Sequence, residues 1–415
     1  MKSISILNKY KFEFILNLMV ILFYIFIYTN LHFQLSENIM FSTPDSLSYL
    51  NVSKWIETGN VTNSIEIRPF LFPLLLFICL KIGYFTIWFL HLIFWIVSYN
   101  LIYQTVVSIT NNKIYSVLPV LFFVTNLSLI TMSFHALTEL TATFLISLFC
   151  YIIVKYRFVL KEIKIFHYML IVLIFLSLIR PVFTYFTLFF GVLMLIKGNF
   201  KNYFQKPKLL YLLILIISPL IIQITINKIT FNSISISKIG NQTITDYYLT
   251  DGIIHLTNKN RNEARKIARE MNRSKKIELL MNNKLLYLRI YKNNIIENIR
   301  SSSNFLNYPK GSISPNMYNT MIILNKIYFQ LHLIFAFLIP ISLIIMYKQK
   351  KTELIFLTIS INSILIFILL TSGVSNRQGD RLVLPSIGCW TTLYSIVLFS
   401  ILKNKNLFFG KFRFL

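Results

Sequence analysis

The chain has 415 residues, of which 55% are hydrophobic and 13% charged, and its mean hydropathy of +0.64 is typical of a membrane protein rather than of a soluble domain. The net charge of +26 would suggest a nucleic-acid partner in a soluble protein. Here most lysines flank apolar runs, where they anchor and orient membrane spans, so no nucleic acid is expected. Three cysteines without paired spacing and six scattered histidines predict neither a disulfide framework nor a metal site.

Apolar runs of about 20 residues recur along the chain, and each is long enough to cross a hydrocarbon layer of about 30 Å. They predict an all-α polytopic membrane protein with about ten transmembrane helices. The predicted spans are 14–31, 84–105, 114–133, 138–155, 165–180, 182–197, 209–228, 321–347, 352–371 and 382–402. The run at 69–83 is apolar but short, and it predicts a re-entrant or interface-lying helix on the outer side.

The distribution of lysine and arginine orients these spans. If the N-terminus is cytoplasmic, the short inner segments carry far more basic residues than the short outer segments, as the positive-inside rule requires. The richness in Ile, Asn and Lys resembles that of proteins from AT-rich bacterial genomes. We therefore expect a multi-pass protein of the bacterial inner or plasma membrane, with both termini in the cytoplasm.

Three regions follow from this reading: an N-terminal transmembrane core at 1–228 with a first outer loop at 32–70, a basic outer loop at 229–320, and C-terminal transmembrane helices at 321–415. The loop at 229–320 is predicted to be mostly helical, because an apolar stripe runs through its second half. The stripe consists of Ile267, Met271, Ile277, Leu280, Met281, Leu285 and Leu288. This helix either lies on anionic headgroups or over an outer cleft, or it presents a solvated face.

The first acidic residue of the outer loop is Asp45, in "TPDSLSYL". Thr43 or Ser42 can cap a helix that has Pro44 in its first turn, and an acid there suits the helix dipole. This local role alone could explain Asp45. Tyr49 follows four residues later and therefore shares its helix face.

Arginines and further acids lie at the same predicted membrane surface. Arg68 follows Glu66 in "IEIRPFLFP", and it could merely extend its charge to the interface. Arg180, in "SLIRPVF", stands between two apolar runs, where a charge is costly and usually faces a cavity or a partner. "FHALTEL" contributes His135 and Glu139.

A further pair of arginines lies before the last predicted span. "SGVSNRQGDRLVLP" contains Arg377 and Arg381 on either side of Asp380. An ion pair between Asp380 and either arginine is the simplest interpretation. Taken together, the charged residues on one side of one membrane predict a polar site facing lipid.

The ordered fragments resemble the GT-C superfamily of polyprenyl-phosphate-sugar-dependent glycosyltransferases, which includes the protein mannosyltransferases and the aminoarabinose transferases of lipid A. The resemblance rests on "PDSLSYL" after the first span, "IRPFLFPLLL", "LTEL" opening a span, "LIRP" closing one, and "GDRLVLP" before the last span. It covers roughly residues 10 to 200 and 370 to 400. The segment 229–320 matches no family pattern, and a large soluble C-terminal domain is lacking.

The resemblance implies an inverting hexosyltransferase with a GT-C-like fold and an extracytoplasmic active site. Asp45 would be the catalytic general base. Arg68, Arg180, Arg381 and Arg377 would bind the lipid phosphate, and Tyr49, Glu66, His135 and Glu139 would position the acceptor or the donor.

The implied partners are a polyprenyl-phosphate sugar donor, a glycan, lipid or protein acceptor, and membrane lipids. No Asp-x-Asp motif occurs near Asp45, so neither a cofactor nor an essential metal is expected. Binding of a divalent cation to Glu66 and Glu139 stays an open alternative. Two other functions stay open as well. An envelope polysaccharide polymerase or ligase would also use outer arginines, on a lipid pyrophosphate, and a transporter or flippase would favour charges at mid-membrane.

Overall fold

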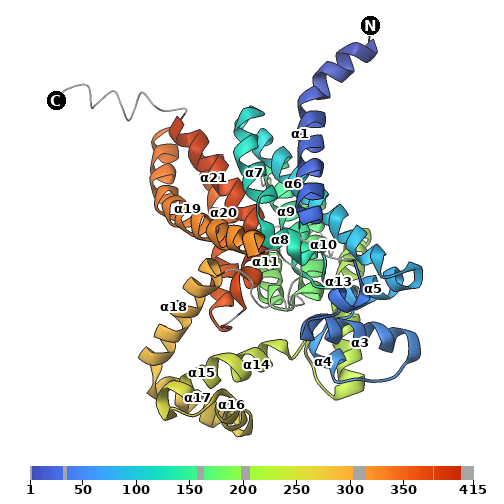
Figure 1. Cartoon of the computed structure of the whole chain (residues 1–415), viewed down its shortest axis with the longest axis vertical. Coiled ribbons are helices and arrows are strands. Elements are labelled where there is room, and N and C mark those ends of the chain that lie inside the picture. Colours follow the sequence, from blue (N-terminus) through green and yellow to red (C-terminus); the bar gives the residue numbers. More distant parts are fainter. Residues whose placement is uncertain are drawn as a thin grey trace, which may run out of the picture.

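The computed structural model describes residues 2–30, 35–156, 163–197, 206–301, 315–376 and 378–402. These residues form helices and no strands (Figure 1), which confirms the all-α prediction. The first part comprises α1 (Lys2–Asn30), α2 (Glu37–Met40), α3 (Pro44–Thr58), α4 (Ser64–Ile67), α5 (Leu71–Ile82), α6 (Phe85–Thr110), η1 (Ile114–Ser116), α7 (Val117–Val124), α8 (Leu127–Met132), α9 (Glu139–Lys155), α10 (Ile163–Ile179), α11 (Phe183–Lys197) and α13 (Pro207–Phe231).

The segment that is predicted to lie on the outer side, called here the outer segment, and the C-terminal helices follow. The outer segment contains α14 (Ile239–Thr243), the π-helix η2 (Ile244–Leu249), α15 (Thr250–Thr257), α16 (Arg261–Glu270), α17 (Arg273–Asn282) and α18 (Lys284–Arg300). The C-terminal part contains α19 (Pro315–Lys348), α20 (Thr352–Ser372), the short 3₁₀ helices η3 (Gly379–Leu382) and η4 (Leu384–Ser386), and α21 (Ile387–Leu402).

Six helices among the described residues are long and apolar enough to cross a membrane: Lys11–Thr29, Phe85–Thr110, Pro207–Phe231, Asn319–Lys348, Thr352–Ser372 and Leu384–Ile401. The protein is therefore a helical protein with the composition of a membrane-embedded chain, but the predicted count of about ten spans is not supported. The helices α9 and α10 have 17 residues each, a rise of about 26 Å, and α11 has 15.

The run predicted as one span at 114–133 is broken into η1, α7 and α8. The break lies at Thr125 and Asn126, because the Asn126 side chain caps α8 by accepting a hydrogen bond from the Leu129 backbone N–H at 2.9 Å. The short run at 69–83 forms α5, whose 12 residues rise about 18 Å. A helix of this length fits the prediction of a non-spanning element.

The core of the molecule is the bundle of α9, α10, α20 and α21, whose apolar side chains form one large buried cluster. The helix α6 packs along α9. Gly388 lets α21 approach α9 closely, since a Cβ at this position would lie 2.7 Å from Ser147 Oγ. This tight packing fixes the two short 3₁₀ helices that precede α21, and with them Arg381.

The outer segment is helical, as predicted, but its second half consists of three helices instead of one. Asn260 and Asn272 cap α16 and α17 through hydrogen bonds to backbone N–H groups at 3.0 and 2.9 Å. The predicted apolar stripe is divided. Ile267, Met271 and Leu280 pack on a small cluster around Tyr287, whereas Ile277, Met281, Leu285 and Leu288 are exposed.

The outer segment is tied at both ends to loops that carry arginines. At one end, the Lys238 backbone N–H donates to the Glu66 carbonyl at 3.0 Å. At the other, the Asn298 amide donates to the Ser372 and Ser375 carbonyls at 3.0 and 2.9 Å. In Figure 1 the helices α14 to α18 form an arc from α4 to the lower end of the C-terminal helices. The loops around 64–70 and 372–382 are thus held by one segment.

Candidate functional site

Asp45 lies in the first turn of α3, where the sequence predicts it. Thr43 is the N-cap, with its hydroxyl accepting from the Ser46 backbone N–H at 3.0 Å, while Ser46 Oγ accepts from the Thr43 N–H at 3.1 Å. This capping box and Pro44 at the first helical position confirm the predicted helix start. The cap holds Asp45 in a fixed direction at the end of the helix.

The Asp45 carboxylate binds two arginines from distant parts of the chain. Arg68 donates to its Oδ1, and Arg381 Nη2 donates to its Oδ2 at 2.5 Å. Arg381 also reaches Glu139, with its Nε 2.5 Å from Glu139 Oε1. Arg180 Nη2 donates to the same Glu139 oxygen at 2.9 Å. The charged cluster is therefore an alternating chain of Arg68, Asp45, Arg381, Glu139 and Arg180.

The charged cluster carries one net positive charge, because three arginines face two carboxylates. Its members differ in exposure. The Glu139 side chain is fully buried and that of Arg381 is 9% exposed, whereas the Asp45 side chain is 31% exposed. Asp45 is thus the member that an incoming molecule reaches most easily. The one excess positive charge of the cluster suits an anionic ligand.

The arginines keep Asp45 ionised. Burial would raise the pKa of the Asp45 carboxyl, but attraction to Arg381 and Arg68 and their hydrogen bonds lower this pKa well below its usual range. Burial opposes the charge of both guanidinium groups, but Tyr49 and Asp45 raise the pKa of Arg68, and Glu139 and Asp45 raise the pKa of Arg381. In this arrangement Asp45 is a weak base, since its charge is already stabilised by two cations.

Two neighbours on α3 orient Arg68. Its guanidinium lies 4.7 Å from the centre of the Tyr49 ring and 3.4 Å from Tyr49 Oη. Its Nε donates to Ser48 Oγ at 3.3 Å. Tyr49 therefore joins the cluster, as its spacing from Asp45 predicts. Ser48 was missed, although its position three residues after Asp45 places it on the same helix face.

His135 lies next to the cluster on a buried turn. Its Nδ1 is 3.3 Å from Ser42 Oγ, and the following Ala136 N–H donates to the Met40 carbonyl at 3.0 Å. These contacts join the loop before α9 to the start of the Asp45 loop. Burial, with a smaller effect from Arg381, lowers the pKa of His135 to about 4.

Among the predicted site residues that the structure describes, Glu66 lies apart from the charged cluster. Glu66 pairs with Lys238 of the outer segment, because α4 turns its side chain toward that segment. Glu66 and Glu139 thus bind different cations, and no shared cation site forms between them. Arg377 lies outside the described residues. Among the residues that the structure describes, no group of three or more His, Cys, Asp or Glu is placed to hold a metal ion.

Of the two arginines that the sequence offers to Asp380, Arg381 binds other carboxylates, and Arg377 lies outside the described residues. Asp380 Oδ2 accepts a hydrogen bond from Asn325 Nδ2 at 3.1 Å, while Arg381 points to Asp45 and Glu139. The two residues are neighbours on a 3₁₀ helix, where successive side chains point about 120° apart. Asp380 therefore faces α19, and Arg381 faces α3 and α9.

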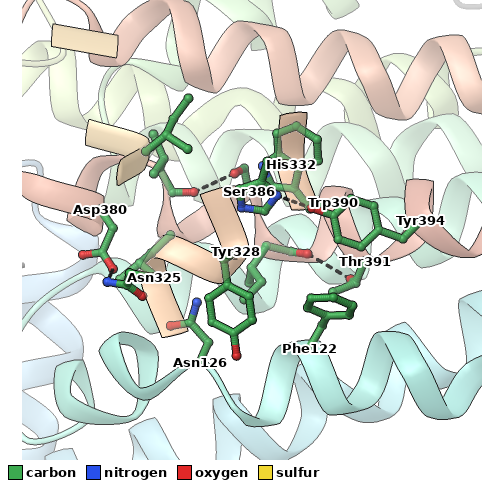
Figure 2. A pocket seen from close by; sticks show the side chains of 14 residues that line it. Phe122, Asn126, Asn325, Tyr328, His332, Asp380, Ser386, Trp390, Thr391 and Tyr394 are labelled. Carbon is green, nitrogen blue, oxygen red and sulfur yellow. Dashed lines mark hydrogen bonds between the residues drawn. The ribbon is translucent and has the colours of Figure 1, made fainter. Parts of the chain in front are cut away.

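A pocket begins at Asp380 and runs between α7, α19 and α21 (Figure 2). Polar groups line its end near Asp380, and aromatic rings line the rest: Phe122, Tyr328, Trp390 and Tyr394. His332 stacks on Trp390 with ring centres 4.2 Å apart. The cavity between these side chains is small, with a volume of about 40 Å³.

The chain matches no family model, no curated protein and no solved structure. The resemblance to the GT-C superfamily therefore stays a prediction from the quoted motifs. The geometry of the charged cluster is independent of that resemblance.

Proposed function

We propose that the protein is an integral membrane glycosyltransferase that moves a sugar from a polyprenyl-phosphate donor to an acceptor hydroxyl at the outer face of the membrane. The observation that carries this proposal is the charged cluster. Its five charged side chains come from five separate segments: α3, the turn after α4, the start of α9, the turn after α10, and η3. Buried charges are costly, so an arrangement of five argues for a role beyond packing.

The arginines supply what the leaving group needs. When the sugar leaves, negative charge grows on the phosphate of the lipid donor, and planar guanidinium groups bind phosphate oxygens bidentately. Arg68 and Arg381 are held at this point by Asp45. A donor phosphate would compete with Asp45 for both arginines, because it carries at least as much negative charge. Donor binding would then replace one anionic partner of the arginines by another.

This exchange of partners gives Asp45 its role. With the arginines drawn to phosphate, the pKa of Asp45 rises toward its ordinary value. The freed carboxylate then accepts a hydrogen bond from the acceptor hydroxyl and takes its proton as the new C–O bond forms. The bond from the anomeric carbon to the phosphate oxygen breaks, and the lipid phosphate leaves with that electron pair. Attack opposite the leaving group inverts the anomeric centre.

The arrangement of the helices supports an outer location. In Figure 1 α3 and α4 lie at the end of the molecule away from the N-terminal end of α1. If that terminus is cytoplasmic, as the charge distribution predicts, the Asp45 loop faces the outside. Both substrates would then meet at the outer surface of the bilayer.

Transfer assays with purified protein in nanodiscs test the proposal. A panel of radiolabelled polyprenyl-phosphate hexoses is incubated with an envelope extract as acceptor source. We expect the wild type to consume at least one of these donors and Asp45→Asn to consume none. The matched control is Glu57→Gln, which removes an exposed carboxylate at the far end of α3 and should keep activity.

Thermal unfolding of each variant separates loss of chemistry from loss of fold. Full activity of a folded Asp45→Asn variant would remove Asp45 from the reaction. If the wild type consumes no lipid monophosphate sugar but consumes a lipid pyrophosphate oligosaccharide, the protein is instead a polymerase or ligase of envelope polysaccharide.

A further inference from the structure

On α17 and α18 of the outer segment, four large apolar side chains are more than half exposed, where no membrane span explains them. Ile277 and Met281 on α17 are 51% and 67% exposed, and Leu285 and Leu288 on α18 are 76% and 61% exposed. Most of the other strongly exposed apolar side chains lie on helices with the composition of membrane spans. These four residues, called here the α17–α18 face, lie outside them. Exposed apolar groups of this size usually mark an interaction surface.

The α17–α18 face is surrounded by positive charge. The basic residues of α16 to α18 are Arg261, Arg265, Lys266, Arg269, Arg273, Lys275, Lys276, Lys284, Arg289, Lys292 and Arg300, and the acidic residues are Glu263, Glu270, Glu278 and Glu297. Arg261 and Arg269 form ion pairs with Asp251 and Asp246. Lys275, Lys284, Arg289 and Lys292 are exposed and stand within four sequence positions of one of the apolar side chains. The excess charge favours an anionic partner over a neutral one.

The position of the α17–α18 face fits the boundary of a bilayer. In Figure 1 the helices α15 to α17 lie at the same height along the long axis as the lower end of α13. The helix α13 is apolar and long enough to span a membrane. Beyond its end, Ile234 is 78% exposed. The end of a span marks the region of lipid headgroups. With α13 crossing a bilayer along this axis, α17 and the start of α18, which follows at Lys284, are at the height of the headgroups.

We propose that the α17–α18 face rests on an anionic lipid bilayer. Ile277, Met281, Leu285 and Leu288 enter the boundary between headgroups and acyl chains, and the surrounding lysines and arginines bind lipid phosphates. Through Lys238 and Asn298, the outer segment holds the loops of Arg68 and Arg381. Lipid contact at this face would therefore steady both loops. The proposal concerns membrane contact and stands whether or not the protein transfers a sugar.

Site-specific fluorescence on the full chain in nanodiscs tests the contact. The variants Met281→Cys and Leu285→Cys are labelled with an environment-sensitive dye, while the native cysteines are buried and do not compete. Glu263→Cys, at an exposed polar position on α16, is the matched control. In nanodiscs that contain phosphatidylglycerol, brominated lipids should quench the dye at 281 and 285 but not at 263, and aqueous iodide should show the reverse.

Charge variants and neutral lipid complete the test. Quenching by lipid should fall in nanodiscs of phosphatidylcholine alone. Quenching should also fall when Lys284→Gln or Arg289→Gln is added to the labelled variants. Each charge removed should lower the equilibrium constant for contact with the bilayer by about fivefold. Equal access of iodide to all three labels in both lipids would overturn the proposal. Protection of 281 and 285 from both quenchers would overturn it too, because it would indicate a protein on this face.

Discussion

Replacing Arg381 with methionine tests whether the charged cluster holds distant helices together. Arg381 joins Asp45 of α3 to Glu139 of α9, and the Glu139 side chain is fully buried. Removing one partner of a buried ion pair costs about 3–5 kcal/mol, because the other charge stays buried. Each carboxylate keeps one other arginine here, so we expect a loss near the lower limit, about 3 kcal/mol in the free energy of unfolding.

Unfolding in mixed micelles of detergent and SDS, followed by tryptophan fluorescence, measures this loss. The matched control is Lys81→Met, which breaks the pair of Lys81 and Glu57. Their side chains are 57% and 48% exposed, and exposed pairs contribute at most about 1 kcal/mol. A second variant, Glu139→Gln, alone and together with Arg381→Met, gives the coupling energy of the pair, expected at about 1–3 kcal/mol.

The result for Arg381 would contradict this reasoning in either of two ways. One is a loss of stability no larger than that of Lys81→Met. The other is strict additivity of Arg381→Met and Glu139→Gln, since contacting charges must show coupling.

Two further predictions concern pH and the outer segment. Because burial lowers the pKa of His135 from 6.5 to about 4, unfolded chains take up a proton first as pH falls, and stability should drop by about 3 kcal/mol between pH 6.5 and 4. His135→Asn should remove this part of the pH dependence. The same dependence of stability on pH in the wild type and in His135→Asn would contradict this prediction. Asn298→Ala deprives the Ser372 and Ser375 carbonyls of their donor. Hydrogen exchange in α18 should become faster, with a loss of about 2 kcal/mol in the protection free energy of its backbone amides. The control Asn293→Ala, at an exposed position of the same helix, should leave the exchange unchanged.

Local features of this protein could be predicted from the sequence because they depend on neighbouring residues. The start of α3 at Pro44 with Thr43 as cap needs only a few side chains. Long apolar runs predict membrane helices from composition alone. The described helices do not support the predicted number of about ten spans, because composition does not reveal where a helix breaks. Asn126 interrupts one apolar run by capping a new helix.

The partners of the charged residues were decided only by the tertiary structure. Arg381 binds Asp45 across 336 positions of sequence, whereas its neighbour Asp380 turns to Asn325. Glu66 stands two residues from Arg68 but pairs with Lys238. Sequence proximity could not separate these choices, since an ion pair depends on distance and direction in space. The packing of α3, α9 and α21 brings the charges together, while the amino-acid sequence determines which charges each helix carries.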